Sequence, residues 1–104
     1  ESKLLDGLKL GSSGIITATC NVTSKLARRV YDDFIDKHDQ TQNYKLCKVR
    51  EVFDQFNLIS GLHTFLCQKD QSFKNLLPPL SILPEKNKKK LFEDLKKLDF
   101  NIKY

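Results

Sequence analysis

The chain has 104 residues, of which 39% are hydrophobic and 30% charged, as expected for one small soluble domain and not for a disordered or fibrous chain. No apolar run approaches the roughly 18 residues that a membrane span needs, and the first residues lack the basic and apolar regions of a signal peptide. The net charge is +5, but arginine is scarce and no aromatic residue interrupts the lysines near residues 86–90, so we expect no nucleic-acid partner.

The first elements are a short helix and a strand. Leucines recur at helical spacing over residues 3–10 and predict a helix. Gly11 to Gly14 then interrupts it, and Ile15 to Cys20 is a β-branched run without strong polar alternation, typical of a strand buried on both faces of a parallel sheet. One strand cannot form a sheet, so either its neighbours lie in sequence outside this chain or the segment has another role in it.

The remainder of the chain is predicted to be helical. Apolar residues at helical spacing indicate helices near residues 24–36, 42–55, 58–68 and 85–98. Between the last two helices, prolines favour an extended conformation over Leu76 to Leu80. The expected buried faces are formed by Leu26, Val30, Phe34, Val49, Phe53, Leu62, Leu66, Leu91 and Leu95.

Few residues carry chemistry of their own. The three cysteines are an odd number without a C-x-x-C pair, so we expect reduced thiols in a cytoplasmic protein, with no disulfide framework and no metal site. His38 lies in a polar stretch, and His63 lies within a predicted helix, where a hydrogen-bonded structural histidine is more common than a base. Neither has a paired carboxylate or nucleophile nearby in the sequence, so independent catalysis is not indicated.

Three stretches carry a family resemblance. The run from Gly14 to Val22, GIITATCNV, resembles the last barrel strand of the dihydrodipicolinate synthase / N-acetylneuraminate lyase family, whose pattern is roughly G-x-I-S-x-T-x-N-V. The segment from Asn75 to Leu83, with Leu-Pro-Pro-Leu before the final helix, is similar to the C-terminal helical region of that family, as is Phe56 to Leu62. The resemblance covers essentially the whole chain in the right order.

The resemblance implies a fold. Members of this family of class I pyruvate-dependent aldolases are α/β TIM barrels, (β/α)8, followed by a C-terminal helical extension. Residues 1–38 would then be the last helix, strand and helix of the barrel, and residues 39–104 the extension. The chain itself would be a mainly α fragment with one barrel strand, and the intact protein is expected to be a homo-oligomer.

The resemblance also implies a chemistry. A lysine of a G-x-K-[DE] pattern forms a Schiff base with pyruvate or a related 2-keto acid, a tyrosine of a Y-N-x-P pattern assists proton transfer, and no cofactor is needed. Neither pattern occurs in this chain. We therefore expect no catalytic residue here and no lyase activity from the chain alone.

Two residues are expected to bind substrate in the intact enzyme. By alignment, Ile16 corresponds to the strand-eight residue whose backbone carbonyl faces the keto acid, and the hydroxyl of Thr17 would line the site. Glu1 falls near the loop after strand seven, where some sugar-acid lyases place an acidic substrate contact. The segment from Asn57 to Leu62 departs from the synthase sequence Asn-Pro-Ile-Pro-Val-Lys, which favours the lyases and keto-acid aldolases of the family.

Two other functions fit the sequence. The chain can be a stand-alone helical protein-interaction module, with Ile15 to Cys20 as a linker or edge strand, or a weak nucleic-acid binder that uses Lys86 to Lys90. In an isolated chain, the segment from Ile15 to Cys20 would pair with another copy, become helical or lose order. Pairing is favoured, because isoleucine and threonine are strong strand formers.

Overall fold

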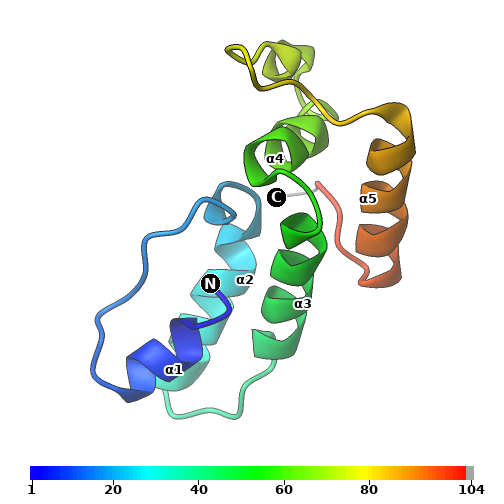
Figure 1. Ribbon diagram of the computed structural model, residues 1–104. Coiled ribbons are helices and arrows are strands. Elements are labelled where there is room, and N and C mark those ends of the chain that lie inside the picture. Colours follow the sequence, from blue (N-terminus) through cyan, green and yellow to red (C-terminus); the bar gives the residue numbers. More distant parts are fainter. Residues whose placement is uncertain (103–104) are drawn as a thin grey trace. The chain divides into compact units, whose positions relative to one another are not determined.

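The computed structural model describes residues 1–102 and is mainly helical, with no strand among them (Figure 1). The chain forms two compact units, of which the first is Glu1–Arg50 and the second begins at Glu51, so that the boundary lies within α3. No helix in the described part is both long and apolar enough to cross a membrane. The helices are α1 Leu4–Lys9, α2 Cys20–Ile35, α3 Asn43–Asp54, α4 Leu58–Leu66, the short 3-10 helix η1 Gln71–Lys74 and α5 Glu85–Lys97.

The expected strand from Ile15 to Cys20 is absent. Residues 12–17 have no regular secondary structure, and Cys20 is already the first residue of α2. The prediction depended on neighbouring strands, and residues 1–102 supply none, so the backbone has no ladder to join. The segment instead forms an open connection between α1 and α2 (Figure 1).

All five predicted helices are present, with one change of boundary. α2 begins at Cys20 and not near residue 24, because the amides of Val22 and Thr23 donate to the carbonyl oxygen of Thr19 and form an earlier first turn. Val22 thereby joins Leu26 and Val30 in one buried stripe at i, i+4 spacing. The extra turn brings two threonines, Thr19 and Thr23, into the interior of the first unit.

The first unit is built on the contact between α1 and α2. Leu4 and Leu8 are the buried residues of α1, as the leucine spacing predicts. After α2, the chain turns at Lys37, whose φ of 56° lies in the left-handed region. The buried carboxylate of Asp33 then accepts hydrogen bonds from the amide and hydroxyl of Thr41, which fixes the connection to α3. Phe34, which the sequence predicts to be buried, is only half-buried.

The second unit is organised around Phe65 of α4, which contacts three other phenylalanines. Its ring lies edge-on to Phe53 at 5.8 Å, is stacked on Phe100 at 5.5 Å and is 6.3 Å from Phe92 of α5. Of the predicted core residues of this unit, Phe53, Leu62, Leu91 and Leu95 are buried, whereas Leu66 is half-buried.

The side chains of His63 and Thr64 in α4 hold the connection from residue 69 to residue 84. Buried Thr64 accepts a hydrogen bond from the amide of Leu83, and the Nδ1–H of His63 donates to the carbonyl oxygen of Phe73. Since a carbonyl can only accept, the proton of His63 is on Nδ1. His63 is therefore a hydrogen-bonded structural residue, and most of the predicted extended stretch from Leu76 to Leu80 lies on the surface.

Candidate functional site

The densest polar cluster of the first unit surrounds the carboxylate of Glu1, whose side chain is fully buried. Oε2 accepts hydrogen bonds from the Thr17 hydroxyl at 2.8 Å and from Nη1 of Arg50 at 3.2 Å. Oε1 accepts from the hydroxyls of Thr19 and Thr23, the latter at 2.9 Å. Four donors from three parts of the chain therefore converge on one carboxylate, and we call these five residues the Glu1 cluster.

The local sequence explains how the three threonines converge. Thr17 and Thr19 are two residues apart, and with the chain bending at Ala18 into α2 both hydroxyls reach the Glu1 carboxylate. Thr23 lies one helical turn after Thr19, and its hydroxyl also donates to the carbonyl oxygen of Thr19. Arg50 reaches the same point from α3 and also contacts the Thr19 hydroxyl at 3.3 Å. The passage from the bend into the helix thus gathers the hydroxyls on one side.

The surroundings of the Glu1 carboxyl favour its ionised form. Burial raises the pKa of the Glu1 carboxyl, but the hydrogen bonds donated by Thr19, Thr17 and Thr23 outweigh it and leave the pKa lowered. A carboxylate that is ionised and saturated with donors is a poor general base, because it has little affinity for another proton. The cluster is therefore suited to orienting hydroxyl groups and not to proton transfer.

The two expected substrate-binding residues have different surroundings. Thr17 is half-buried and donates a hydrogen bond to Glu1, the residue that the resemblance placed near the loop after strand seven. The side chain of Ile16 is fully exposed and lies outside the Glu1 cluster. Sequence analysis missed Thr19, Thr23 and Arg50; the i, i+2, i+6 spacing of the threonines was the available signal.

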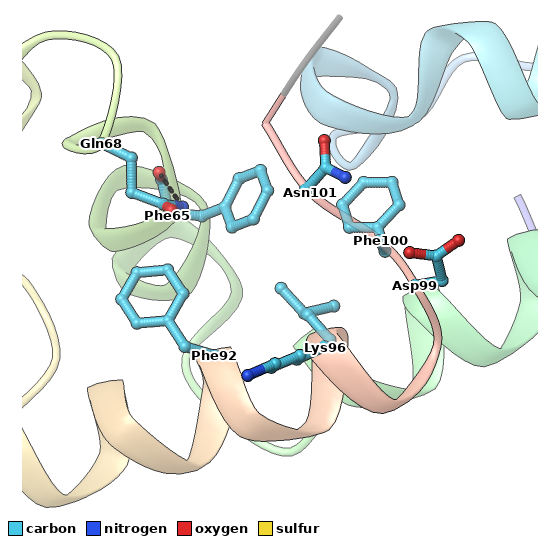
Figure 2. A pocket seen from close by; sticks show the side chains of 8 residues that line it. Phe65, Gln68, Phe92, Lys96, Asp99, Phe100 and Asn101 are labelled. Atoms are coloured by element: carbon cyan, nitrogen blue, oxygen red, sulfur yellow. Dashed lines mark hydrogen bonds between the residues drawn. The ribbon is translucent and has the colours of Figure 1, made fainter.

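The second unit contains a hollow of about 260 Å³ between α4, α5 and the residues after α5 (Figure 2). Its walls include the aromatic rings of Phe65, Phe92 and Phe100, and its polar rim includes Gln68 and Lys96. Figure 2 shows the three rings on different sides of the hollow. No carboxylate–histidine or carboxylate–cysteine pair lines it, so it has the character of a packing defect or a binding hollow and not of a catalytic centre.

Metal-ligand groups, reactive cysteines and buried lysines are the other features that could carry chemistry in the described residues. Among residues 1–102, no group of three or more His, Cys, Asp or Glu side chains could hold a metal ion. The three cysteines are not in disulfides, and burial is the main cause that raises the pKa of Cys20, which disfavours its reactive thiolate form. No lysine in the same range is buried, although a Schiff-base lysine is commonly activated in a desolvated pocket.

Comparison of the chain with protein-family models, with curated proteins and with solved structures finds no match.

Proposed function

We propose that this chain is the C-terminal part of a Schiff-base-forming keto-acid lyase or synthase of the dihydrodipicolinate synthase / N-acetylneuraminate lyase type, and that it is inactive alone. The intact protein would be an α/β TIM barrel in which residues 1–38 complete the barrel and residues 39–104 form its helical extension. The observation that carries the proposal is the sequence from Gly14 to Val22, which follows α1 and continues into the first turn of α2, in the order that the family requires.

Two structural features support this proposal. The exposure of side chains alternates from residue 16 to residue 18, as it does in a strand: Ile16 and Ala18 are exposed, whereas Thr17 is half-buried. In addition, Thr17 and Glu1 contact each other, and the carboxyl ends of barrel strands are where substrates bind in such barrels. In the intact enzyme, the carbonyl of Ile16 and the hydroxyl of Thr17 would face pyruvate or a related 2-keto acid.

The experiment that tests the proposal is determination of the coding sequence upstream of the codon for Glu1. The proposal expects a G-x-K-[DE] pattern on a predicted strand about 30 residues upstream, which is one repeat of a TIM barrel, and a Y-N-x-P pattern before it. An upstream sequence without strand–helix alternation, or a start codon directly before Glu1, would contradict it.

The second candidate is a stand-alone helical interaction module without catalytic activity. The helical content of residues 1–102 favours it, because α1 and α2 pack in the first unit, and Phe53, Phe65 and Phe100 are buried in the second. The two proposals differ in what covers Ile16. A barrel supplies strands on both sides of this residue, whereas a module leaves it exposed or uses it to bind a partner.

A further inference from the structure

The donors of the Glu1 cluster match the hydrogen-bonding capacity of a carboxylate. Oε1 of Glu1 accepts from the hydroxyls of Thr19 and Thr23. Oε2 accepts from the Thr17 hydroxyl at 2.8 Å and from Nη1 of Arg50 at 3.2 Å. An ionised carboxylate has about four lone-pair positions, whereas an amide or an alcohol has fewer and carries no charge. These four donors are therefore complementary to a carboxylate as a chemical group, whichever molecule carries it.

The four donors also hold one another in place without the help of Glu1. The Thr23 hydroxyl donates to the carbonyl oxygen of Thr19 at 3.0 Å, and Nη1 of Arg50 lies 3.3 Å from the Thr19 hydroxyl. The hydroxyls of Thr17 and Thr19 are 3.3 Å apart. Thr19 and Thr23 are both fully buried at the start of α2. Because the donors are already ordered, binding of an acceptor costs little conformational entropy.

Glu1 reaches these donors from a different part of the chain. It precedes α1, whereas the donors lie at and before the start of α2 and on α3. The amide of Leu4 donates to the carbonyl oxygen of Glu1, a backbone contact that does not involve the Glu1 side chain. That side chain is fully buried, but the side chain of Arg50 is 24% exposed, so one edge of the site meets solvent. Removal of the Glu1 side chain would leave buried donors without their acceptor, which favours binding of a replacement from solution.

We propose that the four donors form a binding site for a small monocarboxylate, and that the Glu1 side chain fills this site as a tethered ligand. A free carboxylate of the size of formate or acetate takes the place of the Glu1 carboxylate when that side chain is removed. The wild-type chain is closed to such ligands, because tethering gives its own carboxylate a high effective concentration. The proposal goes beyond the lyase assignment and does not depend on it, since every contact lies within the first unit.

Thermal unfolding of Glu1→Gly, in the chain of residues 1–104, tests the proposal with sodium acetate as the probe. Glycine removes the carboxylate and its carbon linker, which gives acetate room to approach, and it keeps the backbone contact with Leu4. At about ten times its Kd, acetate should raise the Tm of the variant by about 5 °C relative to sodium chloride of the same ionic strength. Isothermal titration should give saturable binding with a Kd of about 1–10 mM. If the variant is unfolded without acetate, acetate should restore its helical circular dichroism.

Three controls assign the effect to this site. The wild type, whose site is filled, should have the same Tm in the two salts, and acetamide, a neutral molecule of the same shape, should not stabilise Glu1→Gly. The double variant Glu1→Gly/Thr17→Val lacks one donor and should bind acetate about tenfold more weakly. The proposal is overturned if acetate stabilises Glu1→Gly no more than chloride does, or stabilises the wild type equally. Equal effects of acetamide and acetate, or undiminished binding by the double variant, also overturn it.

Discussion

The Glu1 carboxylate connects the start of the chain to α2 and α3 through single hydrogen bonds from four side chains. Its contribution to stability must therefore depend on pH. The pKa of Glu1 is lowered in the folded chain, so the stabilisation is fully present above the ordinary pKa of a glutamate and is lost as the pH falls through the lower, folded value.

We predict that Glu1→Gln lowers the free energy of unfolding at pH 7. The variant should also lose less of its free energy of unfolding than the wild type as the pH falls. In the wild type, the free energy of unfolding should fall as the pH drops below about 4.3, the ordinary glutamate value, because protonation removes charge from the cluster. Urea unfolding followed by circular dichroism between about pH 7 and pH 3 measures both effects. The control is Glu93→Gln on the exposed face of α5. Equal pH profiles for wild type and Glu1→Gln would contradict the prediction.

Thr64 offers a second test at the level of one hydroxyl group. Its Oγ1 donates to the carbonyl oxygen of Ser60 and accepts from the amide of Leu83, and both Thr64 and Leu83 are buried. Thr64→Val keeps the shape but leaves the Leu83 amide without an acceptor, which should cost about 1–3 kcal/mol in the free energy of unfolding. Thr64→Ser retains the hydroxyl and should cost less. If the valine variant proves as stable as the serine variant, the hydrogen bond from the Leu83 amide to Thr64 makes no net contribution to stability.

Part of the candidate site could be predicted from sequence. The resemblance drew attention to Thr17 and Glu1, and the structure brings their side chains together. Arg50 could not be found in this way, because it is 49 residues from Glu1 and reaches it only through the packing of the first unit. Thr19 and Thr23 were within reach of pattern analysis, but their convergence required α2 to begin at Cys20.

At the scale of elements, helix α4 has the clearest local signal for where it begins. The side chain of Asn57 accepts a hydrogen bond from the amide of Ser60, which satisfies one of the free donors in the first turn. We predict that Asn57→Ala destabilises the chain by about 1 kcal/mol, while Asn57→Asp, which keeps the acceptor, changes stability little. Thermal unfolding of the three proteins is the measurement. A loss of the same size in both variants would show that the cap is not responsible.

The helices were predicted correctly, whereas the predicted strand is absent, and the difference has a physical reason. A helix satisfies its hydrogen bonds within itself, so the apolar stripes of Leu26 and Val30 or Leu91 and Leu95 suffice to locate α2 and α5. A strand needs a neighbour, which residues 1–102 do not supply to Ile15–Cys20. The earlier start of α2 has the same origin, since Cys20 is free to join the helix when no sheet holds it.

At the scale of the whole molecule, the chain lacks the reacting groups of the enzyme type proposed for it. A Schiff-base lyase needs an activated lysine and a proton-transferring tyrosine, and the motifs that carry them in the family are absent from this sequence. The lysines that the structure describes are exposed or half-buried. Under the proposal, the chain would contribute barrel closure and one wall of the site, and the reacting amine would come from another part of the protein.

Borohydride trapping tests this division directly. The full product of the coding sequence that contains this chain, and residues 1–104 alone, are each treated with pyruvate and sodium borohydride, and peptides are analysed by mass spectrometry. We predict one reduced pyruvate adduct in the full product, on a lysine upstream of Glu1, and no specific adduct within residues 1–104. An adduct on a single lysine of residues 1–104, or a full product that traps no pyruvate, would contradict the account.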